Sequence, residues 1–575
     1  MSNRIQTGSN GIAQSRSENA REANFEAGRA LSELIRTTLG PKGMDKMITT
    51  DEGEILVTNN GSSILNRIDV RHPAASVIVE LAHQQNDRVS DGTTTVVVLA
   101  GELLSNAERL IEAGVHPTKI TRGYSLAANR AVETLEENTI AVDPENEDHL
   151  RNVCTTVITG RWDEQSKNFL ADRAIETLGA IRDGRTVNLE KVTRKSLPGG
   201  SYYDSRVVSG LAIDVAESST TFVSPDEYLP KVFEPATVAI VDGQLTIESA
   251  KGQGTVSLTS PEQLEEFREH ELETYRTYAD VIAGTGADVV FCQKSIDDPV
   301  RYLLARNGVL AVERTRRDEL HELERTTGAR AVAKVTELSS DDTGVAKRIE
   351  REPVGSTELA IVTAEEPSDG TDRQTGADHV SLILRGGTEH VAEETKRIVD
   401  DCLLVLKLVI EEGSVLPGGG AIEMEIAREL REYAPTLMGH EQLAVEAFGD
   451  ALETIPRTIA ESAGMDPIDA ISELRTRHGN GSSSAGIDAT DSSIRDMTQA
   501  GVIEPLSIKK QAITGAMEAA TVLIRIDDVI AASRGDDHHD AGHGHDHDHD
   551  HGPGGFVEST GGLPWAVGHS QGHSH

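Results

Sequence analysis

Apolar side chains recur at helical spacing through most of the first 150 residues. In 23–39 they share one helix face, which carries Ala27, Ala30, Leu31, Leu34 and Ile35. Gly40 and Pro41 interrupt the pattern directly afterwards, as residues that stop helices do. The same periodicity predicts helices over 74–87, 93–113 and about 118–138. This first part of the chain is therefore predicted to be mainly helical.

The middle of the chain has a different pattern, in which short β-rich runs alternate with charged helical segments. The runs are TVNLEKV, KVFEPATVAIVDG, ADVVFCQ, GVLAVE and HVSLILRGG. One intervening segment, SPEQLEEFREHELETYRTYADVIAGTG, is predicted to be a long polar helix. Strands that alternate with helices favour α/β packing.

The pattern becomes helical again after Asp401. The segments that show it are DCLLVLKLVIEEG, AIEMEIARELREYA, EQLAVEAFGDALETIPRTIAESAG and KQAITGAMEAATVLIRIDDVIAAS. This order suggests that the outer thirds of the chain form one discontinuous domain with another domain inserted between them. At 575 residues, the chain is long enough for about two to four domains.

The last forty residues, 536–575, have no apolar period. They begin DDHHDAGHGHDHDHDHGPGG and hold ten of the chain's 20 histidines. A segment of this composition cannot offset its ordering entropy, so we expect disorder. Imidazoles at alternate positions are competent ligands for Zn²⁺ or Ni²⁺. The alternative, which we favour because a disordered tract has no fixed geometry, is a solvated acidic tail that binds metal only incidentally.

Charge restricts the partners of the chain. Asp and Glu number 95 against 55 Lys and Arg, which gives a formal net charge of -40. Such a field repels nucleic acid and anionic membranes, so neither is expected as a partner. Few aromatic residues, little Lys and an acidic surface fit a halophilic source, and an ordinary acidic cytosolic protein is the alternative.

Cysteine usage and the N-terminal segment favour a soluble, cytoplasmic protein. Cys154, Cys292 and Cys402 form no CxxC pair and lie in apolar contexts such as VVFCQK and DDCLLVL. This is the pattern of buried free thiols in a reducing compartment. The chain shows no apolar signal region and no apolar run of the ~20 residues that a membrane span needs.

A polar loop precedes a strongly apolar helix in the sequence RVSDGTTTVVVLAGELL, at 88–104. A helix N-terminus offers free N–H groups and a positive dipole end, which suit a bound anion. Gly92 would let a phosphate approach, the hydroxyls of Thr93–Thr95 would donate to it, and Asp91 would hold Mg²⁺. The alternative is that Asp91 simply caps the helix, and the motif taken alone favours the cap.

Three more loops are rich in glycine or asparagine: TLGPKG at 38–43, VTNNGSSIL at 57–65 and VLPGGGA at 415–421. None is a GxxxxGKS or GxxxxGKT phosphate loop, and ordinary turn chemistry also explains each of them. In the helix KRIVDDCLLVLKLVI, Asp400 falls in the charged arc, whereas Asp401 falls at the edge of the apolar arc. A carboxylate at that edge requires a partner or a task.

Together these motifs resemble a group II chaperonin, the thermosome class, which is related to the eukaryotic cytosolic chaperonin. The resemblance rests on TLGPKGMDKMI, SDGTTTVVVLAGELL, RGGTEH, VLPGGGA, AGIDA, GVIEPLSIKKQAI and LIRIDDVIAA, in the family's order from about residue 10 to 533. SPEQLEEF and ADVVFCQKSIDD resemble the apical protrusion region of that group. The His-rich tail lies outside the resemblance.

The resemblance implies a multidomain chain with α+β and α/β parts. A mainly helical equatorial ATP-binding domain would comprise 1–149 and 404–535, and a small intermediate domain 150–216 and 377–403. An inserted α/β apical domain, 217–376, would bind substrate. The resemblance also implies stacked rings of identical or paralogous subunits, which enclose unfolded or partly folded proteins as ATP is hydrolysed.

The resemblance further implies the site residues and the cofactors ATP and Mg²⁺, with K⁺ as another candidate. Asp91 would bind Mg²⁺, and the catalytic Asp401, on the intermediate domain, would orient or activate the attacking water. The nucleotide would be held by residues of several loops: Leu39, Gly40, Pro41, Gly92, Thr93, Thr94, Thr95, Gly160, Arg161, Gly418, Gly419, Gly486, Glu504 and Lys509.

Three positions depart from the family pattern. At a catalytic position, Asn60 replaces an aspartate that assists hydrolysis, and an amide can position a water but cannot deprotonate it. Ser90 replaces the usual glycine, and Arg161 replaces the lysine of the loop that senses the γ-phosphate. We therefore predict that Mg-ATP binds but is hydrolysed slowly. The alternatives are a hydrolysis-poor subunit of a mixed ring and, in another class, a metal-buffering tail carried on a chaperonin body.

Overall fold

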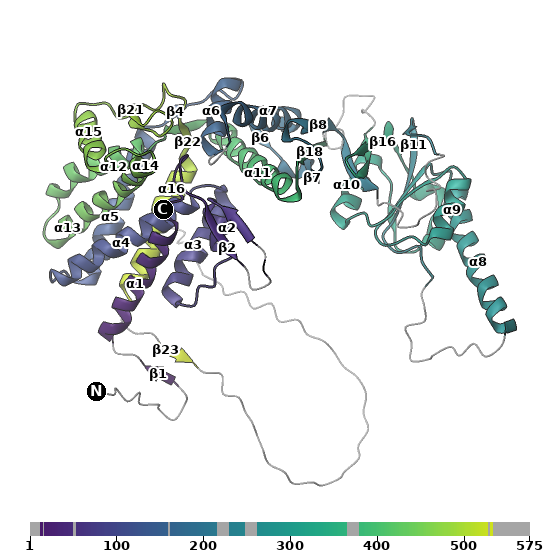
Figure 1. Ribbon diagram of the computed structural model, residues 1–575, viewed down its shortest axis with the longest axis horizontal. Helices are drawn as coiled ribbons and strands as arrows, with labels where there is room; N and C mark the ends of the chain where they lie inside the picture. Colours follow the sequence, from purple (N-terminus) through teal and green to yellow (C-terminus); the bar gives the residue numbers. More distant parts are fainter. Residues whose placement is uncertain are drawn as a thin grey trace, which may run out of the picture. The chain divides into compact units, whose positions relative to one another are not determined.

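The structure, a computed structural model, describes residues 12–14, 17–49, 53, 55–158, 162–215, 229–247, 261–364, 379–526 and 530–532. The chain divides into two units, one formed by Ser15–Val529 and the other by Met1–Gln14 with Ile530–His575. In the smaller unit, β1 (Ile12–Gln14) pairs antiparallel with β23 (Ile530–Ala532). The larger unit holds the other described elements (Figure 1).

The first and the last helices of the larger unit pack into one core. The N-terminal elements are α1 (Ser17–Arg36), β2 (Lys46–Thr49), β3 (Ile55–Thr58), α2 (Gly61–Leu65), α3 (Pro73–Val89), α4 (Thr93–Glu112) and α5 (Pro117–Glu137). The C-terminal helices of this core are α12 (Ala421–Tyr433), α13 (His440–Leu452) and α16 (Leu506–Ile524). Helices α14 (Thr454–Ser462) and α15 (Pro467–Gly479) pack in a separate cluster that also includes Val98 of α4. Helices α4 and α5 both contact α13 and α16 (Figure 1). Helices predicted at opposite ends of the sequence therefore meet in space.

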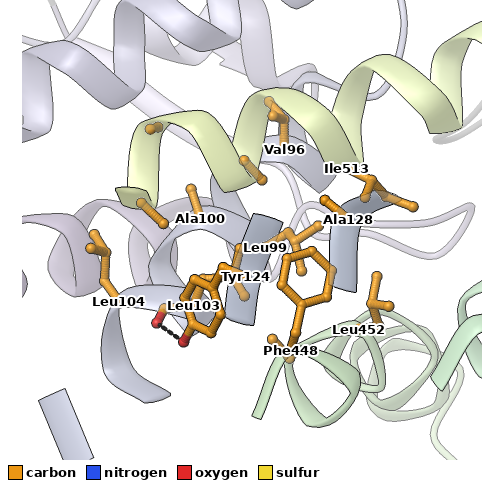
Figure 2. Close-up of a cluster of buried hydrophobic side chains, with 14 of the residues drawn as sticks. Val96, Leu99, Ala100, Leu103, Leu104, Tyr124, Ala128, Phe448, Leu452 and Ile513 are labelled. Atoms are coloured by element: carbon orange, nitrogen blue, oxygen red, sulfur yellow. Dashed lines mark hydrogen bonds between the residues drawn. The ribbon is translucent and has the colours of Figure 1, made fainter. Parts of the chain in front are cut away.

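Helix α4 lies inside this core because its side chains are apolar on nearly every face. Figure 2 shows α4 side chains packed against Tyr124, Phe448 and Ile513, which belong to three other helices. The Tyr124 hydroxyl donates to the Leu103 carbonyl oxygen at 2.8 Å, and its ring meets the Phe448 ring edge-on at 5.6 Å between centroids. Leu99 and Leu103 are buried, and each such side chain stabilises the fold by about 2 kcal/mol. This packing fixes the position of the α4 N-terminus.

A second core is built from three helices and a small sheet. The helices are α6 (Glu147–Val157), α7 (Glu164–Ile181) and α11 (Glu389–Glu412). The sheet has the order β7-β18-β8 and comprises β7 (Val192–Pro198), β18 (Val380–Gly386) and β8 (Arg206–Ser209). A separate two-stranded pair, β5 (Arg182–Asp183) and β6 (Thr186–Val187), precedes β7 in the sequence. Cys154 and Cys402 belong to this core, and they are buried free thiols, as Cys292 is elsewhere. The prediction of buried free cysteines is confirmed.

A parallel sheet in the middle of the sequence is buried on both faces. Its order is β13-β12-β11-β14, from β11 (Ala236–Val241), β12 (Val289–Cys292), β13 (Leu310–Val312) and β14 (Ala331–Val332), and β15 (Gly344–Ala346) pairs antiparallel with β11. Val238 and Ile240 face one core, and Ala239 and Val241 face the other, as the strand period of two requires.

Different layers cover the two faces of this sheet. Helices α8 (Pro261–Gly284) and α9 (Asp298–Arg306) supply apolar side chains to one face. Helix α10 (Arg317–Thr327) covers the other face together with an antiparallel sheet of the order β10-β16-β17-β9. The strands of that sheet are β10 (Val232–Phe233), β16 (Arg348–Val354), β17 (Thr357–Thr363) and β9 (Leu211–Val215). Strands β11 to β14 alternate with α8, α9 and α10 along the chain, which confirms the predicted α/β packing.

Two small sheets lie near the helical core. One has the order β22-β19-β4, from β4 (Ile140–Ala141), β19 (Ser414–Pro417) and β22 (Ile503–Pro505). The other is the hairpin of β20 (Ala485–Asp488) and β21 (Ser493–Asp496). None of the described helices combines the length and hydrophobicity of a transmembrane span.

Three predicted segments differ in the structure. TVNLEKV is not one strand, because a 3-10 turn at Leu189–Lys191 separates β6 from β7. The helix expected over 441–464 breaks at Glu453, whose buried carboxylate pairs with Arg431 and Arg475. The last helix ends at Ile524, and a strand follows at Ile530–Ala532. Apolar periodicity misses the first two breaks because buried residues lie on both sides of each of them.

Candidate functional site

The start of α4 carries the polar loop, and no described side chain caps it. Its N-cap residue is Gly92, which is left-handed with φ 78°. The side chain of Asp91 accepts from the Gly92 N–H at 2.6 Å instead of from the N–H groups of Thr94 and Thr95, which a cap would bind. The alternative in which Asp91 simply caps α4 is therefore wrong. The first-turn N–H groups remain for another acceptor.

Asp91 is a carboxylate that would gain from a cation. Burial raises the pKa of Asp91, although the Gly92 N–H and the cations Lys509 and Arg397 oppose this shift. Within the described residues, no three His, Cys, Asp or Glu side chains gather as a metal site. A Mg²⁺ ion on Asp91 would therefore complete its shell with ligand and water oxygens, as Mg²⁺ in phosphate sites does.

The loop before α2 packs against the start of α4. A Cβ atom on Gly61 would lie 2.4 Å from Thr94 Oγ1 and 3.1 Å from Thr93 Oγ1, so this contact requires glycine. Asn60 is the N-cap of α2, and its Oδ1 accepts from the Ser63 N–H at 2.8 Å. The segment VTNNGSSIL, predicted to be a loop, thus contains a helix start that lies beside the threonines.

Helix α11 supplies a carboxylate and an arginine one turn apart. Arg397 Nη1 donates to Asp401 Oδ2 at 2.8 Å, and the Asp401 side chain is 20% exposed. The neighbouring Asp400 instead pairs with Arg194 of β7, with 2.9 Å from Nε to Oδ1. The prediction that Asp401 has a partner is confirmed. Burial raises the pKa of Asp401 to about 7, Arg397 opposes the shift, and neighbouring carboxylates add to it.

Residues from separate segments line one small cavity of about 90 Å³. The lining residues are Asn60, Ser90, Asp91, Thr93, Thr156, Val157, Arg397, Ile398 and Asp401. Four of them, Asn60, Asp91, Thr93 and Asp401, are site residues expected from the sequence. The cavity has room for a phosphoryl group or a few waters but not for a whole nucleotide. Thr94 and Thr95 share the first turn of α4 but do not line it.

A second group of predicted residues meets where β19, β20 and β22 come together. A Cβ atom on Gly486 would lie 2.9 Å from the Gly418 carbonyl oxygen and 3.0 Å from that of Gly419. A Cβ atom on Gly418 would lie 2.7 Å from Glu504 Oε1. Glycine is therefore required at these positions, because neighbouring atoms of the protein already fill the space that a side chain would take.

Lys509 lies beside this glycine group as part of an internal ion pair. Its Nζ is 2.7 Å from Glu423 Oε1 and 2.7 Å from Glu504 Oε2. Burial disfavours the ammonium charge, but the two glutamates raise the pKa of Lys509 overall. The charge of Lys509 is therefore already matched by two carboxylates. Sequence reasoning missed Glu423, which had no signal beyond its helix.

The remaining predicted residues have varied positions. Leu39 is buried in a cluster with Val98 of α4 and Ile487 of β20. Gly40 is left-handed with φ 85°, and Pro41 is exposed. Gly160, Arg161 and the His-rich tail 536–575 lie outside the described residues.

Comparison with known proteins identifies the family. The family model of the TCP-1/cpn60 chaperonin family matches residues 31–534. The chain belongs to this family. Its mixed helical and sheet content is that of a chaperonin chain, and the resemblance found in the sequence is confirmed at this level.

Thermosome subunits are among the relatives of this chaperonin chain. Thermosome subunit alpha of Halobacterium salinarum is 42% identical over 515 residues, which cover 90% of this chain and 89% of that protein. A thermosome subunit of Methanopyrus kandleri is 42% identical over 518 residues, which cover 89% and 92%. Thermosome subunit 1 of Haloferax volcanii is 42% identical over 531 residues, which cover 91% and 92%.

Several cavity residues of the chaperonin chain escaped the sequence reasoning. Arg397 precedes Asp401 by four positions, the spacing of a helical ion pair, and this signal was available. Thr156 and Val157 end α6 and had no recognisable motif. They reach the cavity only because α6 packs on α11.

Proposed function

We propose that this chaperonin subunit hydrolyses ATP at the cavity that α4, α6 and α11 form with the start of α2. The observation that carries the proposal is that Asn60, Asp91, Thr93 and Asp401 line one cavity. An uncapped helix start suits a phosphate, and a carboxylate from another helix suits the attacking water. These are the parts that transfer of a phosphoryl group to water needs.

The donor set fits ATP with Mg²⁺. A bound Mg²⁺ ion would supply charge that neutralises phosphate oxygens. Asp91, whose pKa is raised by burial, would hold the ion, and Thr93 with the first-turn N–H groups of α4 would bind phosphate. On the family resemblance, Gly418, Gly419 and Gly486 would lie beside the ribose and base. K⁺ is proposed as a further cation on family resemblance alone.

Asp401 would orient the attacking water and accept its proton. Burial raises the pKa of Asp401 to about 7, and a carboxylate in that range is an effective base near neutral pH. Asp401 lies on α11, whereas Asp91 lies on the loop before α4. A movement of α11 relative to α4 would therefore make hydrolysis conditional on closure.

We extend the proposal to a stacked-ring chamber, of identical or paralogous subunits, that encloses unfolded or partly folded proteins. The domain limits would be 1–149 with 404–535, 150–216 with 377–403, and 217–376. Three separate buried cores, around α4, α11 and β11, support such a division. Buried free thiols support a cytoplasmic location, and the net charge of -40 supports a high-salt source.

A second candidate is a subunit that binds ATP but hydrolyses it poorly within a mixed ring. Asn60 favours it, because its amide cannot accept a proton and its Oδ1 is engaged in capping α2. The two candidates share the same nucleotide site and differ only in turnover.

Single-turnover hydrolysis by the purified homo-oligomer tests the proposal. We expect slow, Mg²⁺-dependent phosphate release, and ring closure with ATP seen by electron microscopy. ATP binding without phosphate release would favour the second candidate. Absence of both binding and rings would contradict both.

A further inference from the structure

Arg397 is held between two carboxylates on one face of α11. Its Nε and Nη2 donate to Glu394 Oε2 and Oε1 at 2.9 and 2.6 Å, and its Nη1 donates to Asp401 Oδ2 at 2.8 Å. The spacings of three and four residues place the three side chains on the same helix face. Each guanidinium nitrogen therefore has a carboxylate acceptor, and the group cannot turn without losing one of them.

Asp401 depends on this arginine. Across the part of the chain that the structure describes, Arg397 is the side chain that hydrogen bonds to Asp401. Its other charged neighbours are repulsive, since Asp91 lines the same cavity and Asp400 is adjacent in the chain. Without Arg397, the Asp401 carboxylate would be stabilised by turning away from the cavity.

We infer that Arg397 is a positioning residue: Glu394 fixes its guanidinium, and the guanidinium fixes the Asp401 carboxylate at the cavity. The inference rests on the proposed ATPase function. A direct role on phosphate is less consistent with the geometry, because the guanidinium is already used by two carboxylates. An oriented carboxylate matters because small misplacements of a reacting group are costly.

Steady-state phosphate release at varied Mg-ATP tests this role. Arg397→Met is expected to lower kcat by roughly 10- to 100-fold and to change KM by less than about twofold. Arg397→Lys should recover part of the loss, because one ammonium can reach one carboxylate but cannot fork between two. Glu394→Gln should lower kcat less, in the same direction. Arg194→Met removes the adjacent arginine–Asp400 pair and is the matched control, with kcat unchanged.

A double-mutant cycle decides whether Arg397 acts through Asp401. In single-turnover measurements that follow the residual hydrolysis of an Asp401→Asn background, Arg397→Met should cause no further loss. An equal loss in both backgrounds, or a raised KM with weakened binding of ATP relative to ADP, would mean that Arg397 contacts phosphate and would overturn the inference.

Failure of the proposed function is separable from failure of this inference. If the wild-type protein releases no phosphate, the proposed hydrolysis is wrong. The positioning role of Arg397 is then tested by an experimental structure of the Arg397→Met variant. The Asp401 carboxylate is expected to leave the cavity in that variant. A carboxylate that stays in place would refute the positioning role.

Discussion

The starts of α4 and α7 both carry an aspartate but differ in structure. Each helix follows an aspartate, Asp91 in SDGTTT and Asp163 in WDEQS. Asp163 Oδ1 accepts from the Ser166 N–H at 2.8 Å and from the Ser166 hydroxyl at 2.7 Å, as a helix cap does. Asp91 accepts from the adjacent Gly92 N–H and lines the cavity that Asp401 also lines.

The ionisation of the two aspartates follows from these contacts. Hydrogen bonds from Ser166 hold the pKa of Asp163 below its usual range, whereas burial raises the pKa of Asp91. The first aspartate uses its charge inside its own helix, whereas the second, among the described residues, accepts only from the adjacent Gly92 N–H and would be available to a cation. The hydrogen-bond partners of the carboxylate, more than the residue type, therefore distinguish a helix cap from a candidate ligand.

The largest difference between the two helix starts is expected in turnover. Asp91→Ala should lower Mg²⁺-dependent ATP hydrolysis by roughly 100-fold or more, because the cation loses its protein ligand. Asp163→Ala should keep the turnover and lower the melting temperature, because α7 loses its cap. Phosphate release and thermal melting of both variants check this. Equal turnover in the two variants would make α4 an ordinary helix start.

A smaller effect is expected from Asn60, which lines the cavity next to Asp91. Asn60→Asp should raise turnover roughly tenfold, because a carboxylate can take up a proton that an amide cannot. It should still cap α2, since aspartate is an equally good cap. Asn59→Asp adds the same charge one residue away and is the control. If Asn60→Asp leaves the rate unchanged while Asp401 matters, the argument from Asn60 fails.

The opposite pKa shifts predict opposite effects of pH on stability. The pKa of Asp91 is higher in the folded protein than its ordinary value of about 3.9. Ionisation of Asp91 therefore destabilises the fold as the pH rises from the ordinary pKa through the pKa in the folded protein. The pKa of Asp163 is lower in the folded protein than its ordinary value. Ionisation of Asp163 therefore stabilises the fold above about pH 4, and this stabilisation is lost as the pH falls through the pKa in the folded protein. Without Mg²⁺ at pH 7, Asp91→Asn should raise the melting temperature and Asp163→Asn should lower it. Both differences should shrink at low pH, and shifts of the same sign at pH 7 would argue against the contrast.

The smallest effect concerns Ser90, which ends α3 just before Asp91. Ser90 is left-handed with φ 50°, a conformation that costs a non-glycine residue about 1 kcal/mol. Ser90→Gly should therefore stabilise the protein by up to about 1 kcal/mol in thermal or denaturant unfolding. Ser492→Gly, at a second left-handed serine with φ 49°, is the comparison variant and should gain less, because it also loses the hydrogen bond that Ser492 Oγ donates to the Ala463 carbonyl oxygen at 2.8 Å. A destabilised Ser90→Gly variant beside a stabilised Ser492→Gly variant would indicate that the Ser90 side chain has a structural role.

The sequence predicts the long elements well and the site only in part. The apolar period predicts α4 closely, since buried positions repeat from Thr93 to Ala107. The apolar period does not predict the break at Glu453, because the break coincides with ion pairs that Glu453 forms with the distant residues Arg431 and Arg475. At the site, the residues are recognisable by motif, but their hydrogen bonds are not. The spacing of Arg397 and Asp401 suggests an ion pair, but only the fold shows that Asp91 does not cap α4 and that this pair lies at the cavity.

The most direct test of whether this cavity hydrolyses ATP compares purified wild-type and Asp401→Ala protein. Phosphate release is measured at saturating Mg-ATP, and ATP binding is measured in parallel. The account predicts slow, Mg²⁺-dependent release by the wild type and no detectable release by Asp401→Ala, with equal ATP binding by both. Equal phosphate release by the two proteins would contradict it.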